Sequence, residues 1–581
     1  MFNYILFDLD NTIYNYDNAH QKAINFVFDK IHDDFKVNKI ELEISFKNEK
    51  KKYQQCCYRQ ASSHNKFIQI KKLLELYSLD LSKVNYYYEI YTKTFNESIE
   101  LYPNVLNFIK FCKSKNIKMY ILTNNICRDQ LERLTHMNII HFFEKIYTSE
   151  EFGIEKPDIK LFYYILSDIG CNKDEIVKIG DNYLNDIEPL YLNNIYSFWF
   201  NCNNNNNFTI TEKYIIFKDY TYLLHFFKEY YNECERFLNI SDFVGERFDL
   251  VQAGGGNTSF KIRDLMFVKS SGCCLTNMSV NKDYVGVNFI NIKKQVKDIH
   301  SHNKKEREVQ SKNIVDSNKI LLKKYKPSIE TTLHCLTKKY TVHIHPIQFN
   351  AISALPKCHD ILNNLFRDLE EEYCLINYVT PGIDVTLELL KKYKNENIIF
   401  LKNHGLVFTS DNIKDLKKII HETISKLEHH LDLNYFKYRF VNDISKNLKE
   451  ISKERKITYL SENIYLDTFI NSEPDFNTVF TSFFPDKVVY CGISYCNIDK
   501  ENIDKQINSY IDTYREIPKI FILKLNKYYL YISSSSINKC REIEQVLVSH
   551  FMCYQDNNIF LDKKEINYLN NWDAEKYRKL V

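Results

Sequence analysis

Short apolar segments alternate with longer helical stretches through the first part of the chain. This alternation is the feature that most restricts which folds the chain can adopt. Residues 4–9, 118–123, 176–180 and 195–200 are rich in Ile, Leu, Phe and Tyr, which is typical of buried strands. The intervening segments are long enough for helices, and the region 18–97 is the longest of them. Strand and helix in this order predict a parallel, Rossmann-like α/β sheet surrounded by helices.

The length of the chain requires more than one folded unit, because 581 residues are several times a typical domain of about 150. We predict a first domain over 1–230, with a helical cap at about 15–100. After residue 230 the strand-like segments become short and are separated by turns, as in FDLVQA and YVGVNFI. An α/β/α domain is expected at 231–435. An α+β extension is expected at 436–581, with KVVYCGISY as one of its strands.

The composition is that of an ordinary globular protein. Apolar residues make up 44% and charged residues 26% of the chain, which excludes disorder over most of its length. Lys and Arg (78) nearly balance Asp and Glu (75), so no global charge attracts the chain to nucleic acid or to an anionic membrane. No apolar run reaches the roughly 18 residues of a membrane-spanning helix. The 16 cysteines lack regular spacing and the N-terminus lacks a basic leader, which together predict reduced thiols and a cytoplasmic protein.

The first expected strand ends in a pair of carboxylates. Asp8 and Asp10, followed by Thr12, lie at its carboxyl end, where parallel α/β sheets bind their ligands. Asp8 is a candidate nucleophile for attack on phosphorus, and Asp10 is a candidate general acid and base. Taken alone, the same pattern also occurs in turns and at helix N-caps.

Later segments, again at strand ends or in the loops that follow, supply further groups that phosphate chemistry needs. Thr123, with Asn124 beside it, offers a hydroxyl to a phosphate oxygen, and Lys156 offers a cation. Asp181 and Asp186 offer two carboxylates to Mg²⁺. Each has a simpler interpretation, Lys156 as a surface lysine and Asp186 as an acid on a helix face. Their common order favours one site.

In these motifs and their order the sequence resembles the haloacid dehalogenase superfamily over about residues 1–230. The resemblance implies that Asp8 is phosphorylated and that Asp10 protonates the leaving group. It also implies phosphate-binding roles for Thr12, Thr123, Asn124 and Lys156, and Mg²⁺ ligands at Asp8, Asp10, Asp181 and Asp186. Because the phosphatase branch of the superfamily has the second aspartate, the implied reaction is phosphoryl transfer. The long segment between Asp10 and Thr123 leaves room for the cap, which selects the substrate in this superfamily.

Glycine is scarce in the chain, with 12 residues, so the run Gly254–Gly256 before Asn257 is informative. A second loop follows at Ser271 and Gly272. Backbone amides in such loops form nests for phosphate oxygens. The glycine run is otherwise a flexible hairpin turn, although three successive glycines cost conformational entropy unless a close approach requires them.

Three histidines and one glutamate form a second candidate constellation. His343 and His345 alternate within an apolar strand, so both imidazoles project from one face. His404 follows another strand and can supply the third ligand of a catalytic zinc site. Glu330, in the segment that begins with Pro327 and Ser328, is a candidate proton carrier beside the metal. A pair of histidines in a strand is more often two partly exposed polar residues.

These segments together resemble the class II aldolase/adducin family, which includes the fuculose- and rhamnulose-1-phosphate aldolases, over about residues 232–435. The resemblance implies Zn²⁺ held by His343, His345 and His404, with Glu330 as acid and base. It implies substrate or phosphate contacts at Gly255, Asn257, Ser271, Gly272 and Ser328. Ile329 departs from the pattern, because the short aldolases have a second serine there. The long C-terminal extension resembles that of long bacterial members of the family.

The two resemblances predict a bifunctional sugar-phosphate enzyme. One half is expected to hydrolyse a phosphomonoester with Mg²⁺. The other is expected to cleave a ketose 1-phosphate into dihydroxyacetone phosphate and an aldehyde, with zinc as a Lewis acid. The family also contains epimerases, dehydratases and decarboxylases, and the non-catalytic adducins leave an interaction module open as an alternative. Phosphorylated sugars are the expected substrates, and family aldolases imply a homo-oligomer, a tetramer here.

Overall fold

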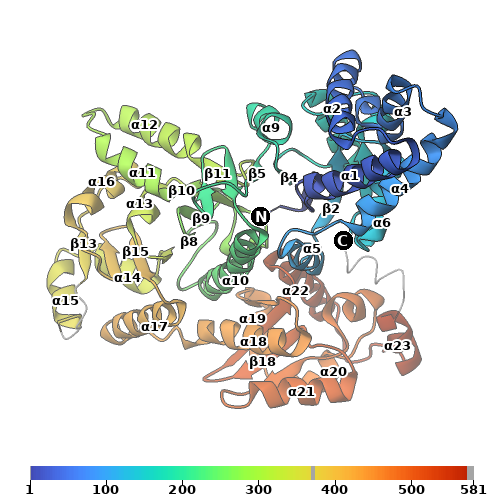
Figure 1. The fold of residues 1–581 in the computed structure, drawn as a ribbon. Helices are drawn as coiled ribbons and strands as arrows, with labels where there is room; N and C mark the ends of the chain where they lie inside the picture. The colour runs from blue at the N-terminus through green and yellow to red at the C-terminus, as the bar shows by residue number, and fades with distance from the viewer. Residues whose placement is uncertain (1, 368–372, 572–581) are drawn as a thin grey trace.

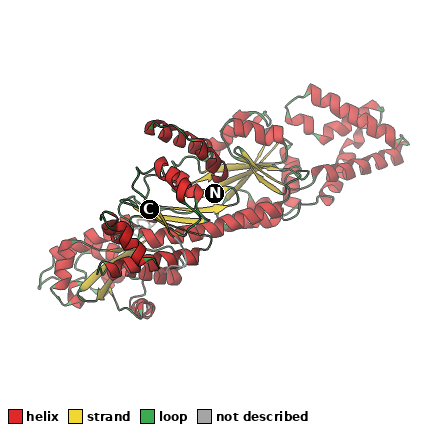
Figure 2. Ribbon diagram, turned by 90° about the vertical axis from the view of Figure 1, so that its left-hand side faces the viewer, coloured by secondary structure: helices red, strands yellow, loops and turns green. Residues whose placement is uncertain are grey.

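The computed structural model describes residues 2–367 and 373–571. Within these ranges the strands form three sheets, and each sheet is flanked by helices (Figures 1 and 2). No helix in the described ranges combines the length and the apolar character that crossing a bilayer requires.

The first sheet confirms the predicted parallel α/β arrangement. Its strands pair in parallel except for β6, which runs antiparallel to β7 at one edge. In their order across the sheet, the strands are β3 (Lys145–Thr148), β2 (Lys118–Thr123), β1 (Tyr4–Phe7), β4 (Ile176–Gly180), β5 (Ser197–Phe200), β7 (Tyr214–Phe217) and β6 (Phe208–Ile210). β3 and β6 were not predicted, because their short segments carry few apolar residues.

Two sets of helices accompany this sheet. Four helices form the cap between β1 and β2, where the sequence places it, and Figure 1 shows them gathered at one end of the molecule. The cap comprises α1 (Tyr16–Phe35), α2 (Lys39–Cys56), the 3₁₀ turn η1 (Ala61–His64), α3 (Lys66–Leu76), the 3₁₀ turn η2 (Leu81–Lys83) and α4 (Val84–Glu97). The helical segments between the strands are α5 (Val105–Ser114), α6 (Cys127–His136), η3 (Ile140–Phe142), α7 (Ser149–Phe152), α8 (Ile159–Ile169), η4 (Tyr183–Ile187) and α9 (Glu188–Leu192).

The second sheet has eight strands, antiparallel except for the pair β13–β14. Across the sheet they are β11 (Lys319–Leu321), β10 (Tyr284–Asn288), β9 (Leu265–Lys269), β8 (Asn257–Ile262), β12 (Tyr340–Ile344), β15 (Gly405–Ser410), β14 (Ile398–Leu401) and β13 (Cys374–Ile376). Both faces are covered, because Leu265 and Phe267 of β9 belong to one apolar core and Met266 and Val268 belong to another. This layering matches the predicted α/β/α domain.

The helices of the second domain lie on both faces of its sheet. They are α10 (Tyr220–Gly245), η5 (Leu275–Asn277), α11 (Phe289–Gln295), η6 (Val296–Asp298), α12 (Lys304–Ser317), α13 (Thr331–Leu336), α14 (Ile347–Ser353), α15 (Cys358–Leu365), α16 (Ile383–Lys392) and α17 (Ile413–His430). The predicted strand FDLVQA is wrong, because residues 248–253 form turns. In those turns the Leu250 carbonyl accepts a hydrogen bond from His345 N at 3.0 Å, so the segment supports the end of β12 instead of joining a sheet.

Helix α10 runs through residue 230, where the sequence predicted a domain boundary. Its first half packs on the parallel sheet, with the Phe227 ring 5.8 Å from that of Phe198 in β5. Its second half packs on the antiparallel sheet, with the Phe237 ring 4.9 Å from that of Phe260. All four rings belong to one continuous apolar core, so the two domains share this helix.

The C-terminal part has a third, four-stranded sheet. Across it lie β16 (Ile457–Leu460), β19 (Tyr528–Ser534), β18 (Ile520–Lys524) and β17 (Cys496–Ile498). Its helices are α18 (Phe436–Ser452), α19 (Ile464–Asn471), α20 (Phe476–Val479), α21 (Ile503–Tyr514), α22 (Ile537–Met552) and α23 (Lys563–Asn571). The strand predicted at KVVYCGISY is wrong, because Lys487–Cys491 forms a π-helical turn. The buried Lys487 Nζ closes this turn by donating to the carbonyls of Gly492 (3.1 Å) and Ile493 (2.8 Å).

Candidate active sites

The first candidate site lies where three neighbouring parallel strands end. β1 pairs with β2 on one side and with β4 on the other, so the carboxyl ends of the three strands meet at one edge of the sheet. Asp8 follows β1, Thr123 ends β2 and Asp181 follows β4. The parallel register thereby brings together residues that are far apart in the sequence.

Lys156 joins two of the predicted carboxylates. Its Nζ lies 2.5 Å from Asp8 Oδ1 and 2.8 Å from Asp186 Oδ1. A second lysine, Lys178 of β4, lies 3.1 Å from the same Asp186 oxygen. All four side chains are buried. Lys178 was not predicted, because a lysine inside an apolar strand gives no sign of which face it occupies.

Three carboxylates and one hydroxyl form the centre of the site. The carboxylate oxygens of Asp8, Asp181 and Asp186 lie within 4.8 Å of one another. Thr12 Oγ1 bridges two of these groups, 3.0 Å from Asp8 Oδ2 and 3.1 Å from Asp181 Oδ1. Burial, together with the charge of Asp8, raises the pKa of Asp181 to about 8. Without a bound cation, three acids this close together therefore favour a protonated Asp181 at neutral pH.

The donor set fits Mg²⁺. Hard divalent cations prefer carboxylate oxygens, and this cluster offers three groups at short mutual distance. Asp186 Oδ2 is buried and makes no hydrogen bond with any described residue, whereas Oδ1 is occupied by the two lysines. Gly180 is required here, because a Cβ at this position would lie 2.5 Å from Asp186 Cβ.

The Asp10 carboxylate lies outside this cluster, so the expectation that Asp10 is also a Mg²⁺ ligand stays a prediction. Asn125 Nδ2 and Gln130 Nε2 donate to its Oδ2 at 2.9 and 3.0 Å. Tyr14 donates its hydroxyl to Oδ1, and Arg133 Nη1 lies 3.5 Å from that oxygen. These four side chains hold both oxygens of the Asp10 carboxylate. None of them was predicted, because each has an ordinary polar side chain in a helix or loop.

The two predicted phosphate-binding residues after β2 differ in their surroundings. Thr123 Oγ1 accepts a hydrogen bond at 3.0 Å from Gln130 Nε2, the same group that donates to Asp10. The hydroxyl therefore lies beside the candidate acid. Asn124 exchanges two hydrogen bonds of 2.9 Å with the backbone of Lys156. Its amide positions the lysine loop and does not point to the carboxylate cluster.

The second candidate site lies at the ends of β12 and β15. His343 lies in β12, His345 directly follows the last residue of this strand, and His404 lies in the turn before β15, the antiparallel neighbour of β12. The imidazole nitrogens of the three residues lie within 4.8 Å of one another. Glu330 Oε1 lies 3.4 Å from His343 Nε2 and 3.5 Å from His404 Nε2. The four predicted residues therefore converge.

The electrostatics of this cluster favour neutral imidazoles. Burial, followed by the neighbouring histidines, lowers the pKa of His343 well below its usual value. The same causes lower the pKa of His404 to about 4. Burial raises the pKa of Glu330 to about 7. Neutral imidazoles are the form that ligates zinc, so three nitrogen donors beside one carboxylate fit Zn²⁺.

Close packing explains two glycines beside the histidines. A Cβ on Gly255 would lie 3.1 Å from His345 Nδ1, and a Cβ on Gly405 would lie 2.7 Å from His345 Cδ2. Asn257, two residues after Gly255, is buried. Its amide lies beside Glu330, and a hydrogen bond between the two side chains opposes the rise in the pKa of that carboxyl.

The predicted phosphate loop lies against the segment that carries Ser328. Ser271 N donates to the Lys326 carbonyl at 2.8 Å, and Gly272 adopts a left-handed φ of 83° with no atom near its missing Cβ. Lys269, which was not predicted, is buried and donates to the Gly254 carbonyl at 3.1 Å. This contact ties the two glycine loops together.

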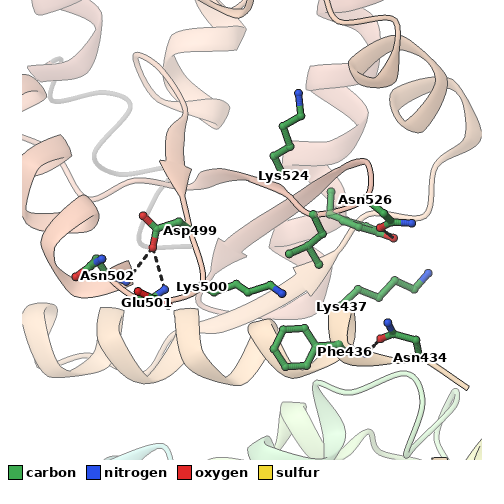
Figure 3. A pocket seen from close by; sticks show the side chains of 11 residues that line it. Asn434, Phe436, Lys437, Asp499, Lys500, Glu501, Asn502, Lys524 and Asn526 are labelled. Carbon is green, nitrogen blue, oxygen red and sulfur yellow. Dashed lines mark hydrogen bonds between the residues drawn. The ribbon is translucent and has the colours of Figure 1, made fainter.

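A groove of about 770 Å³ on the C-terminal domain contains none of these residues. Figure 3 shows Lys437, Lys500 and Lys524 along it. Lys437 is paired with Glu462 at 3.3 Å and Lys524 with Glu473 at 3.1 Å, as on an ordinary solvated surface. The candidate catalytic and metal-binding residues therefore lie in the two buried clusters and not in this groove.

Two known families match separate parts of the chain. Residues 5–189 match the haloacid dehalogenase-like hydrolase family, and residues 237–428 match the class II aldolase and adducin N-terminal domain. The chain joins a haloacid dehalogenase-like domain to a class II aldolase-type domain. Both expected resemblances are confirmed. The haloacid dehalogenase-like domain contains the carboxylate cluster, and the aldolase-type domain contains the three histidines.

Relatives of the haloacid dehalogenase-like domain include phosphatases. The glyceraldehyde 3-phosphate phosphatase of Methanothermobacter thermautotrophicus is 35% identical over 15% of this chain and 38% of its own length. The ribulose-1,5-bisphosphate 5-phosphatase of Halopiger xanaduensis is 26% identical over 32% of this chain and 78% of its own. The chain spans about two fifths of the glyceraldehyde 3-phosphate phosphatases that it matches.

Among solved structures, the aldolase-type domain is similar to the N-terminal class II aldolase domain of a conserved protein from Thermoplasma acidophilum. The two are 23% identical, with a TM-score of 0.30, over 34% of this chain and 93% of the other.

Proposed function

We propose that the haloacid dehalogenase-like domain hydrolyses a phosphomonoester of a small phosphorylated metabolite. The observation that carries this proposal is the ion pair of Lys156 with Asp8 inside the cluster of three acids. Asp8 attacks phosphorus and forms an aspartyl-phosphate, which water then hydrolyses. Asp10, oriented by its four donors, gives a proton to the leaving oxygen and later removes one from water.

The remaining residues bind and neutralise the phosphoryl group. Lys156 and the Thr123 hydroxyl contact its oxygens, and Thr12 holds Asp8 and Asp181 in place. When bound by Asp8, Asp181 and Asp186, Mg²⁺ supplies positive charge that stabilises the transferring group. The test is hydrolysis of 4-nitrophenyl phosphate and of sugar phosphates by the full chain, with and without Mg²⁺. Hydrolysis that needs no divalent cation contradicts the proposal.

We further propose that the aldolase-type domain performs enediolate chemistry on a phosphorylated sugar, with retro-aldol cleavage of a ketose 1-phosphate as the leading reaction. The supporting observation is that Glu330 lies against two of the three converging histidines. Glu330 moves the proton, and the Asn257 amide and the loop at Ser271 and Gly272 bind the substrate. When bound by the three histidines, zinc supplies a Lewis acid for the substrate oxygens.

Two alternatives remain distinct from this reaction. Epimerisation, dehydration or decarboxylation would use the same metal and acid, and product analysis of a sugar-phosphate panel separates them. A non-catalytic, adducin-like module would not need Glu330 beside three neutral imidazoles. A full chain that binds no transition metal supports that module instead. Cytoplasmic location and a homo-tetramer stay predictions, and sedimentation measures the second.

A further inference from the structure

The cap contains a buried lysine that lacks an acidic partner. Lys66 begins α3 and is only 4% exposed, and its Nζ lies 3.3 Å from Gln69 Oε1. Gln69 is itself fixed, because its Nε2 donates to the Ser63 carbonyl at 2.9 Å. No carboxylate of the described residues lies within 4.0 Å of this ammonium. A buried ammonium is normally paired with an acid, so this site has an uncompensated positive charge.

Lys66 lies where the cap meets the reaction centre. Two residues before it, His64 Nε2 lies 3.1 Å from Glu155 Oε1, and Glu155 directly precedes Lys156. The charges of Arg133 and Asp10 both act on the Lys66 ammonium. Arg133 itself lies 3.5 Å from Asp10, and the charges of both residues influence the Lys66 ammonium.

Asp10 and Asp129 offset the charge of Lys66 only in part, because burial, Lys50 and Arg133 have the larger influence on its pKa. Arg133 is balanced, because it lies 3.5 Å from Asp10 and 3.9 Å from Asp129. Burial and the nearby cations Lys50 and Arg133 lower the pKa of Lys66 to about 7. Lys50, in α2, also makes no ion pair within the described residues. The cap side of the site therefore carries excess positive charge.

We propose that Lys66 binds a second anionic group of the substrate, at the end remote from the transferred phosphoryl group. The substrate class is then a phosphomonoester that carries a second phosphate or a carboxylate. An anion at this position supplies the partner that the ammonium lacks, and a charge-assisted hydrogen bond to it is among the stronger polar contacts. This inference rests on the proposed phosphatase function and adds its substrate class.

The test compares four esters with the full chain in the presence of Mg²⁺. Ribulose 1,5-bisphosphate and 2-phosphoglycolate carry a second phosphate and a carboxylate, whereas glyceraldehyde 3-phosphate and 4-nitrophenyl phosphate carry no second anion. We expect KM for at least one doubly anionic ester to be at least about tenfold lower than KM for the other two. The two anionic esters distinguish a phosphate-binding from a carboxylate-binding site.

Lys66→Met keeps the length of the side chain and removes its charge. We expect it to raise KM for the preferred ester by about 10–100-fold and to leave kcat/KM for 4-nitrophenyl phosphate within about threefold. Lys71→Met, at a partly exposed lysine of the same helix that pairs with Glu75, is the matched control and should change neither value. An equal loss for all esters overturns the anion site and assigns Lys66 a structural role.

Two measurements keep the outcomes separate. Calorimetric titration of Asp8→Asn and of Asp8→Asn/Lys66→Met with the preferred ester measures binding without turnover, and equal affinities overturn the proposal. If Lys66→Met does not fold, Lys66→Arg replaces it, because this variant keeps the charge and should keep the preference for a doubly anionic ester. A wild type without that preference also overturns the proposal. A wild type that hydrolyses none of the four esters, including 4-nitrophenyl phosphate, contradicts the phosphatase function itself.

Discussion

Lys156 Nζ lies 2.5 Å from Asp8 Oδ1, and both side chains are shielded from solvent. Burial raises the pKa of the Asp8 carboxyl, and the charge of Lys156 is the strongest opposing influence. The contact therefore favours the ionised carboxylate, which is the form that attacks phosphorus. It also places a fixed cation where the charge of the phosphoryl group must be bound.

Asp8→Asn tests the nucleophile. We expect Mg²⁺-dependent hydrolysis of 4-nitrophenyl phosphate to fall by at least about 10³-fold, because an amide neither attacks phosphorus nor carries the charge. Asp33→Asn, at an exposed acid of the cap, is the control and should retain activity. Zinc-dependent activity of the aldolase-type domain should persist in both variants. Retained hydrolysis in Asp8→Asn would move the nucleophile to another residue.

His343→Ala tests the transition-metal site. Because the nitrogens of three histidines converge, removal of one should release the metal. Elemental analysis of the full chain should show about one zinc in the wild type and in His302→Ala, which changes an exposed histidine of the same domain. Zinc at full occupancy in His343→Ala would exclude this ligand set.

Glu330→Gln tests the proton carrier. The amide keeps the size of the side chain but cannot accept a proton, so the proton-transfer step should slow by about 10²–10⁴-fold. The measurement is exchange of the C3 proton of dihydroxyacetone phosphate with solvent deuterium, with zinc content determined in parallel. Wild-type exchange with zinc bound would assign the base elsewhere, and a tyrosine of the C-terminal extension would be the next candidate.

His334 makes stability depend on pH. It is fully buried in α13, its Nδ1 lies 2.8 Å from Ser259 Oγ, and burial lowers its pKa to about 3. Because the pKa of His334 is lower in the folded than in the unfolded state, its neutral form stabilises the fold. This contribution to the free energy of unfolding is complete above the unfolded-state pKa of about 6.5 and is lost as pH falls toward 3. Between pH 7.5 and 5.5 this histidine should reduce the free energy of unfolding by about 1.4 kcal/mol.

His334→Asn is the matching variant, because an asparagine amide can replace Nδ1 in the contact with Ser259. Its free energy of unfolding in urea should lose about 1.4 kcal/mol less than that of the wild type over the same pH interval. The metal-site histidines titrate in both proteins, so the difference isolates His334. Equal pH dependence in the two proteins would show that this histidine is already protonated or accessible in the fold.

The shared helix predicts that the two domains do not fold separately at the expected boundary. A cut at 230 divides α10 and separates Phe227 from Phe237, which belong to the same apolar core. Fragments 1–230 and 231–581 should therefore lack cooperative thermal unfolding when expressed alone. Co-expression should restore it. A sharp transition in the isolated fragment 1–230 would contradict this dependence.

Most of what the sequence determined is local. An apolar strand that ends in a polar residue can be recognised within a few positions, and this is why β1, β2, β4 and β12 were predicted with the site residues at their ends. Alternation along β12 was sufficient to place His343 and His345 on one face, because successive strand side chains point to opposite faces. Both candidate metal-binding clusters were therefore expected before their geometry was known, with Asp10 as a further expected Mg²⁺ ligand.

Only the tertiary structure decided which charges meet. Lys178 pairs with Asp186, four side chains hold the Asp10 carboxylate, and Lys66 is buried in the cap without a carboxylate within 4.0 Å among the described residues. Helix α10 likewise continues past residue 230 because both sheets cover it. Burial and ion pairing depend on segments far apart in the chain, and no local pattern records the partner that a side chain meets after folding.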